Sequence, residues 1–441
     1  MSDRAADLSD EALVNRCQHA AFGYFVQNVN TGNGLVADTS RPGSPASIAV
    51  VGFALSCYPI GVERGWISRA RAVDLTLSAL RFFRDSPQGK EDDATGHRGF
   101  YYHFLDMQTG QRVWRCELSM VDTALLIAGV LVASAYFDRT DEAEIRDLAD
   151  ALFRRVDWSW AQGSKATLRQ GWKPTSGFLH YGWEGYNEAT LLYVLAMAAP
   201  EHPISGDCFT GWTATYQWEN IYGLDVLYGG PLFMHQFSQA WIDFAGIRDP
   251  FMREKGSDYF ENSRRATLLH REYACRNPHG FKGYGEDLWG LSANDGPGGF
   301  RVRVEGQRHS FFGYAARGAP FGPDDGTIAP WSYLASLPFT PELSLSALRH
   351  LIDRYPLVAP DFRMPSAFNP TLANRRDFGP DGWISNGFYG LDQGIAVMMI
   401  ENHGSGMIWD LMRSNPYIRT GLHRAGFSGG WLAQGGARNA K

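Results

Sequence analysis

The sequence lacks the features that mark several large classes of protein. Its 441 residues include only five cysteines and no CxxC pair, so we expect free thiols rather than a disulfide framework or a structural zinc site. No uncharged apolar run reaches the roughly 18 residues that a membrane-spanning helix needs. The polar, acidic N-terminus has neither the basic nor the apolar region of a secretory signal. These absences predict a cytoplasmic protein, or a periplasmic one if a leader has been removed.

The chain also lacks an excess of positive charge and the common metal and nucleotide motifs. Its formal net charge of −6 disfavours nucleic acid or an anionic membrane as a partner. There is no HExxH pair and no P-loop, and the string GYGEDLWG follows no clear strand, so it is not a dinucleotide fingerprint. We therefore expect no metal and no cofactor. The sequence does not indicate an oligomeric state.

Apolar runs separated by glycine, proline and tryptophan make up much of the chain. Apolar residues account for 44% of it and aromatic residues for 14%, enough for a large core. Most runs exceed the length of a strand and predict helices, some apolar on all sides and others amphipathic. The runs are Ile48 to Tyr58, Ala70 to Phe83, Met120 to Phe137, Glu144 to Trp160, Ala189 to Ala199, Phe233 to Phe244, Leu343 to Ile352 and Gly394 to Met412.

This alternation of buried and half-exposed helices indicates two concentric helical layers. It predicts an all-α fold in a single domain over residues 1–441, a closed α/α barrel, with an open helical solenoid as the alternative. Some β structure is expected from Gly299 to Phe312, inside the long connection from Arg276 to Pro330.

Helix start signals agree with several of these runs. Ser44 followed by Pro45 has the pattern of an N-cap and a first helical residue. Ser119 resembles a capping box with the acid three residues later. Asn187 is expected to cap a helix that begins near Glu188.

Acidic residues gather at these helix starts, beside glycine and aromatic residues. An acid in the first helical turn is often only a cap or a partner of the helix dipole, and this holds for any one of them alone. In an α/α barrel, however, alternate helices start at the same end, so acids there would converge on one cavity. The candidates are Asp38, Glu117, Asp122, Glu184, Glu188, Glu286, Asp287, Asp295, Asp392 and Glu401.

Such a set suits glycoside hydrolysis, which needs one carboxyl group to protonate the leaving oxygen and another to activate water or attack the sugar. The acid must stay protonated near neutral pH, which partial burial among aromatic rings promotes. The rings of Trp183, Tyr186 and Trp289 could stack on glucose. His235 and Gln236 are either polar groups facing the cavity or satisfied core groups.

At these motifs the chain resembles the bacterial glucoamylase-like family that contains the β-1,2-glucanases. The resemblance runs from roughly Gly34 to Gly421 and rests on long stretches in the same order. Among them are GLVADTSRPGSPASIAVVGFAL, CELSMVDTALLIAGVL, GYNEATLLYVLA, YGGPLFMHQFSQAWIDF, GYGEDLWGLSANDGP and YGLDQGIAVMMIENHGSGMIWDLM.

The resemblance implies an (α/α)6 barrel that cleaves β-1,2-glucan or its oligosaccharides with inversion. It implies that Glu188 is the general acid and Asp392 the general base. It also implies a substrate cleft lined by Glu117, Asp122, His235, Gln236 and Asp295. Two other functions stay open: a transglycosylase with the same cleft, and a glucan-binding protein without catalysis.

Overall fold

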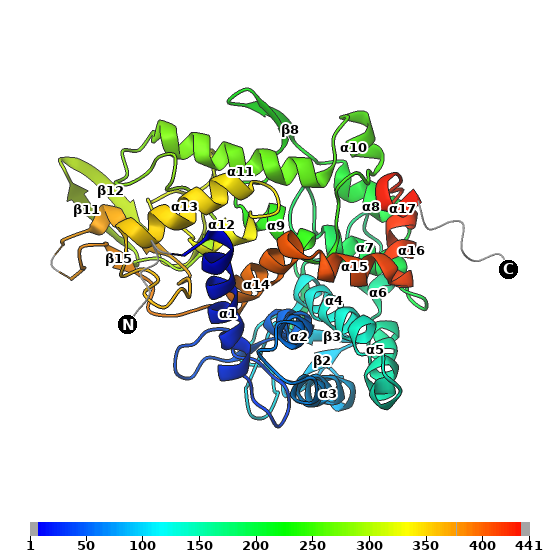
Figure 1. Ribbon diagram of the computed structural model, residues 1–441. Coiled ribbons are helices and arrows are strands. Elements are labelled where there is room, and N and C mark those ends of the chain that lie inside the picture. Colours follow the sequence, from blue (N-terminus) through cyan, green and yellow to red (C-terminus); the bar gives the residue numbers. More distant parts are fainter. Residues whose placement is uncertain (1–7, 376, 434–441) are drawn as a thin grey trace. The chain divides into compact units, whose positions relative to one another are not determined.

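The structure, a computed structural model, describes residues 8–375 and 377–433 and is mostly helical (Figure 1). These residues form two compact units. The first unit contains the described residues up to Tyr24, then Trp218–Phe237 and Glu261–Gly404. The second contains Phe25–Gln217, Ser238–Phe260 and the described residues from Ser405 onwards. The single domain over residues 1–441 stays a prediction.

Four helices of the second unit pack against one another. Helices α2 (Ile48–Glu63) and α4 (Met120–Tyr136) pack against each other and are buried along most of their length, because neither sequence offers a polar face. Helices α3 (Arg69–Asp85) and α5 (Ala143–Arg155) are amphipathic and pack on this pair with their apolar residues buried. Figure 1 shows these four helices in blue and cyan. The predicted pairing of fully buried with half-exposed helices is confirmed in this unit.

Two glycines allow α2 and α4 to approach closely. A Cβ atom on Gly52 would lie 2.2 Å from the Leu125 carbonyl oxygen, and one on Gly129 would lie 2.0 Å from the Gly52 carbonyl oxygen. Neither distance is compatible with a side chain. The backbones of the two helices are therefore in direct contact at this crossing.

The second unit also holds a small antiparallel sheet that the sequence patterns do not predict. Its order is β2 (Gly96–His97), β3 (Phe100–Tyr102), β5 (Leu118–Ser119), β6 (Gly171–Lys173) and β7 (Gly177–Phe178). A separate pair joins β1 (Ala46–Ser47) to β4 (Phe104–Leu105). The unit's other described helices are α6 (Trp158–Gln162), α7 (Thr190–Ala198), α8 (Gly206–Thr213), α10 (Pro250–Glu254), α15 (Met407–Ser414), α16 (Pro416–Arg424), α17 (Gly430–Ala433) and the 3-10 turn η2 (Thr140–Glu142).

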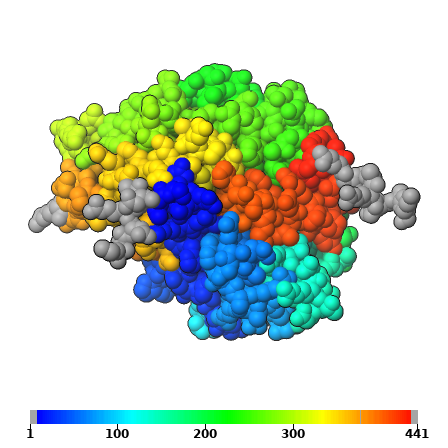
Figure 2. All heavy atoms as spheres, viewed as in Figure 1, coloured from blue at the N-terminus to red at the C-terminus, as the bar shows by residue number. Residues whose placement is uncertain are grey.

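In the first unit, α12 (Trp331–Ala335) packs on the buried α14 (Gly390–Gly404). Helix α1 (Asp10–Gln27) lies beside α13 (Pro341–Arg354) at the surface, the former blue and the latter yellow in Figure 2. Arg349 Nε donates to Asp10 Oδ1 between them, at 2.6 Å. The hairpin of β11 (Phe300–Val304) and β12 (Gln307–Phe311) confirms the β structure expected there.

The first unit also contains several shorter elements. They are β8 (Trp218–Ile221), β9 (Leu224–Leu227), β10 (Ala293–Asn294), β13 (Ala315–Ala316), β14 (Phe368–Asn369), β15 (Trp383–Ile384) and the 3-10 turn η3 (Pro370–Leu372). Two helices, α9 (Phe233–Trp241) and α11 (Tyr259–Arg276), begin in one unit and end in the other, as α1 does.

Three helix predictions need correction. The run from Glu144 to Trp160 is two helices, because the chain is extended at Val156 and Asp157 caps α6 by accepting from the Trp160 amide. The run from Gly394 to Met412 also breaks, at the left-handed residue Gly406. Ser44 is not an N-cap: the chain first forms β1, and α2 begins at Ile48.

The five cysteines are all free, four of them buried and Cys275 exposed, which confirms the expectation of unpaired thiols. Among the helices of the described residues, none is both long and apolar enough to cross a membrane.

Candidate active site

Sheet pairing in the second unit sets His103 beside Glu117. Strands β3 and β5 align Tyr102 with Leu118, so His103, directly after β3, lies opposite Glu117, directly before β5. The His103 amide donates to the Glu117 carbonyl at 3.0 Å, and His103 Nδ1 lies 2.9 Å from Glu117 Oε1. The hydrogen bond from this imidazole lowers the pKa of the Glu117 carboxyl.

The same imidazole reaches the start of α4. Ser119 is the N-cap of that helix: its hydroxyl accepts from the Asp122 amide at 3.3 Å and also donates to Asp122 Oδ2. The contact with the Asp122 carboxylate is therefore made by the serine hydroxyl, whereas the predicted capping box would make it through the serine backbone amide. His103 Nε2 lies 3.5 Å from the same oxygen. The residue that caps the helix therefore also holds the Asp122 carboxylate next to His103. Asp122 is thus both part of the helix cap and a member of the acid cluster.

Asp38 completes this group of acids, because β1 follows it in the chain and pairs with β4, next to His103. Burial raises the pKa of Asp38 to about 6; the negative charge of Asp122 adds to the rise, while His103 and Arg41 oppose it. Burial acts to lower the pKa of His103, but Asp122, Glu117 and Asp38 raise it to about 9. At neutral pH His103 is therefore an imidazolium among acids.

Glu188 lies in the turn before α7, two residues before the first helical residue, Thr190. The expected start near Glu188 is therefore slightly early, because the Asn187 side chain accepts from the Ala189 amide and forms a turn instead of a helix cap. Ser238 fixes this turn: its hydroxyl donates to the Glu188 carbonyl at 2.8 Å and accepts from the Leu191 amide at 3.1 Å.

The Glu188 carboxyl group combines a buried oxygen atom with a raised pKa. Its Oε2 atom is buried and has no hydrogen-bond partner among the described residues. Burial raises its pKa to about 7, and the negative charge of Asp122 adds to the rise. Trp183 Nε1 is likewise buried without a partner in the described part of the chain. A carboxylic acid that stays protonated near neutral pH is suited to proton donation.

The remaining candidates of the second unit have other surroundings. Glu184 is exposed and accepts from the Thr167 hydroxyl at 3.3 Å. The ring of Tyr186 stacks on Tyr259, with centroids 5.8 Å apart. Tyr186 therefore belongs to a cluster of aromatic rings in this unit.

In the first unit, Asp392 is the third residue of α14 and is 5% exposed. Glu401 lies on the same helix nine residues later, about 13 Å along its axis. There it accepts from Gln18 Nε2 at 2.9 Å, so it does not share a site with Asp392. Glu286 pairs with Arg271 at the surface, and Asp287 accepts from Ser346.

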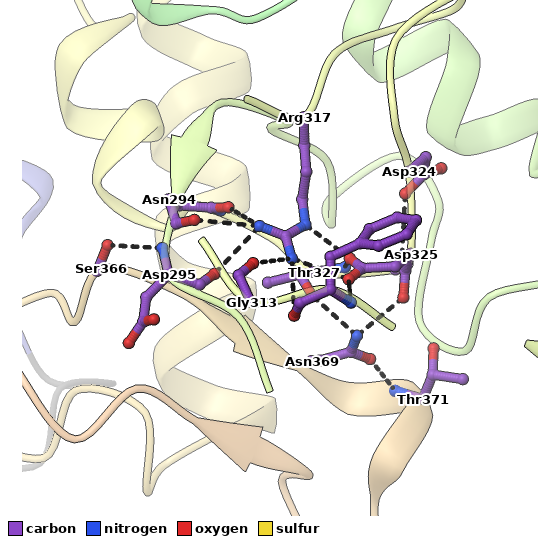
Figure 3. Close-up of polar contacts among 12 residues, drawn as sticks. Asn294, Asp295, Gly313, Arg317, Asp324, Asp325, Thr327, Ser366, Asn369 and Thr371 are labelled. Atoms are coloured by element: carbon purple, nitrogen blue, oxygen red, sulfur yellow. Dashed lines mark hydrogen bonds and ion pairs between the residues drawn. The ribbon is translucent and has the colours of Figure 1, made fainter. Parts of the chain in front are cut away.

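Asp295 is held by a buried network around Arg317 (Figure 3). The Arg317 guanidinium donates to both carboxylate oxygens of Asp325, at 2.7 and 2.8 Å, and neither side chain is exposed. It also donates to Asn294 Oδ1 and to the Asp295 carbonyl. The Asp295 carboxylate points away from this network and accepts from Ser385 Oγ at 2.8 Å.

Three sequence candidates of the first unit are core residues. His235 is 2% exposed, with Nε2 2.8 Å from the Gly229 carbonyl, and burial lowers its pKa to about 4. Gln236 is also buried and donates to the Ser332 carbonyl at 3.1 Å. Trp289 is 1% exposed and packs against a tyrosine ring, so it has no open face for a sugar. This burial corrects the proposed stacking role of Trp289.

His103 is the residue that the sequence analysis misses. It lies in the string GFYYHFLD, whose run of aromatic residues is a weak signal for a strand and does not distinguish the histidine from its neighbours. The strands on either side are only two or three residues long, too short for a pattern search.

Comparisons with known proteins give one family match and several relatives. The model of the Glycoamylase family, described as "Putative glucoamylase", matches residues 180–416. An exo β-1,2-glucooligosaccharide sophorohydrolase (non-reducing end) of Parabacteroides distasonis is 28% identical over 95% of this chain. The match covers 58% of that relative, so this chain spans somewhat more than half of its length.

Two solved structures are similar over almost the whole chain. An endo-β-1,2-glucanase of Chitinophaga pinensis, in complex with sophorotriose and glucose, has a TM-score of 0.81 at 27% identity, covering 96% of this chain and 100% of that one. A β-1,2-glucanase of Parabacteroides distasonis has a TM-score of 0.82 at 26% identity, covering 95% of this chain and 60% of that one.

Proposed function

The chain belongs to the Glycoamylase family, and we propose that it is a glycoside hydrolase that cleaves β-1,2-glucan or its glucooligosaccharides. The β-1,2-linkage follows from the relatives, which are a sophorohydrolase and two β-1,2-glucanases. The proposed architecture is a closed (α/α)6 barrel, as the resemblance of the sequence implies. TM-scores of 0.81 and 0.82 support a fold in common with those glucanases.

One observation carries the assignment of the acid. The Glu188 carboxyl has a buried oxygen without a partner in the described residues, and a pKa raised to about 7. In the proposed reaction Glu188 protonates the glycosidic oxygen as the bond to the anomeric carbon breaks. Because Asp122 is a nearby negative charge, the carboxylate that results is disfavoured and takes up a new proton from solvent.

The other acids have supporting roles in this proposal. Asp392 is the general base that removes a proton from the attacking water, assigned from the family motif in YGLDQG. Inversion of the anomeric centre is proposed on the same basis. Asp38, Glu117 and Asp122 would bind sugar hydroxyl groups, with His103 balancing their charge.

The test uses purified protein and linear β-1,2-glucan. We expect new reducing ends and short products from the wild-type protein, and a loss of roughly 100-fold or more in Glu188→Gln. Glu201→Gln is the matched control: it makes the same change just beyond the other end of α7, on a side chain that is 53% exposed. It should keep wild-type turnover.

The products also separate the alternatives. Chains longer than the substrate with few new reducing ends would identify a transglycosylase. Saturable binding without turnover, with Glu188→Gln changing affinity only, would identify a binding protein. Near wild-type turnover by Glu188→Gln would refute the assignment of the acid.

A further inference from the structure

A loop between β4 and β5 presents an unusual tryptophan. The side chain of Trp114 is 69% exposed, although tryptophan is among the residues with most to gain from burial. Its backbone is in the left-handed region, with φ of 56°, and that of Arg115 follows at 49°. Two consecutive residues with side chains rarely adopt this conformation, because the Cβ atom crowds the backbone.

The loop is fixed by several contacts with β4 and its neighbours. The Val113 amide donates to the Phe104 carbonyl at 3.2 Å, and Arg112 Nε donates to the Cys116 carbonyl at 2.6 Å. The Arg112 guanidinium also lies over the Tyr102 ring, 4.6 Å from its centroid. A strained conformation persists only where the surroundings determine it, and such positions concentrate at ligand sites.

A row of rings connects this tryptophan to the acid cluster of the second unit. The Trp114 ring lies against Phe104, with centroids 5.1 Å apart. Phe104 stacks on the His103 imidazole at 3.9 Å, with their planes 13° apart. His103 in turn contacts Glu117. The exposed ring is therefore two side chains from an acid of the candidate site.

We propose that Trp114 is a sugar-binding subsite, in which its indole face stacks on a glucose ring of the bound glucooligosaccharide. The inference rests on the proposed function for its ligand class. A β-linked glucose ring has an apolar C–H face and no charge, and a rigid indole offers a matching flat surface at low entropic cost. The site favours substrates long enough to extend from the acid cluster to this ring.

Two substitutions test the shape of the side chain rather than its hydrophobicity. Trp114→Phe keeps a flat aromatic ring, whereas Trp114→Leu keeps an apolar side chain that has no flat face. We expect Trp114→Leu to raise KM for linear β-1,2-glucan about tenfold, since an aromatic contact contributes up to about 1.5 kcal/mol. The change in kcat should stay within about twofold. The KM of Trp114→Phe for the same glucan should lie within about threefold of the wild-type value. The KM for sophorose, the shortest β-1,2-linked substrate, should be the same in all three proteins.

The same variants are titrated with β-1,2-glucooligosaccharides by calorimetry in a Glu188→Gln background, which gives affinity without turnover. Wild-type turnover with an unchanged KM in Trp114→Leu would overturn the subsite and leave the proposed hydrolase standing. Binding weakened by Trp114→Leu in a protein that cleaves no glucan would refute the hydrolase and keep the subsite. If the wild-type protein neither binds nor cleaves, both fail. A dimer that Trp114→Leu dissociates, with KM unchanged, would make this ring a protein contact and overturn the proposal.

Discussion

Glu188→Gln should change the stability of the protein in a manner that depends on pH. The folded chain raises the pKa of this carboxyl from 4.5 to about 7, so the native state binds its proton more tightly than the unfolded state. The loss of stability that comes from ionising Glu188 in the folded state is absent below pH 4.5, grows between pH 4.5 and 7, and is constant above pH 7. Glutamine carries no charge and avoids it, so the variant gains stability relative to wild type as pH rises.

The magnitude follows from the same pKa change. At about 1.4 kcal/mol for each tenfold change in proton affinity, a rise from 4.5 to about 7 corresponds to at most about 3 kcal/mol. Because the residue is only half-buried, we expect about 1–2 kcal/mol above pH 7. With an unfolding entropy near 2 cal/mol/K per residue, that is a difference in Tm of about 1–2 °C for a chain of this length.

Differential scanning calorimetry of wild type and Glu188→Gln at pH 5 and pH 8 measures this change. The Tm of the variant minus the Tm of wild type should be larger at pH 8 than at pH 5. Glu201→Gln, whose carboxylate is mostly exposed, should show no such trend. An equal difference at both pH values would refute the conclusion that burial holds the Glu188 proton.

Three further changes test the surroundings of the site. His103→Asn should cost more stability at pH 6 than at pH 10. The acids that raise the pKa of His103 to about 9 stabilise its imidazolium, and this stabilisation is complete below about pH 6.5 and is lost as pH rises through 9. Thermal unfolding at both pH values measures the difference. Gly171→Ala should lower kcat/KM on β-1,2-glucan about tenfold with an unchanged circular dichroism spectrum, since its Cβ would lie 2.9 Å from Glu117 Cγ and displace that side chain. Arg317→Met should cost about 3–5 kcal/mol of stability, because it leaves the buried Asp325 carboxylate without its partner; denaturant unfolding should show the loss.

Much of the helical framework could be predicted because its signals are local. The run from Met120 to Phe137 carries a single acid, Asp122, so it could only be a buried helix, and α4 ends one residue before the predicted boundary. Helix α11 could not be recognised in this way. Its sequence, YFENSRRATLLHREYACR, has polar and charged residues throughout, so it shows no continuous apolar run.

The candidate site was predictable only in part, for a similar reason. Glu188 follows from the contrast between a polar loop and an uncharged helix, which is visible in the sequence. The position of His103 depends on the pairing of two strands of two or three residues each, and no local pattern specifies that register. The burial of Trp289 likewise depends on distant residues that cover its ring.

The glycine crossing of α2 and α4 has a consequence for how the chain tolerates change. Helix α2 begins directly after β1, beside the strand that follows His103, and α4 begins directly after β5 with Asp122 in its first turn. The crossing at Gly52 and Gly129 is therefore a spacer of fixed thickness between the two supports of the acid cluster. A single methyl group added at either glycine would push the two helices apart. A substitution at a buried position without chemical function would then change how the acids are aligned.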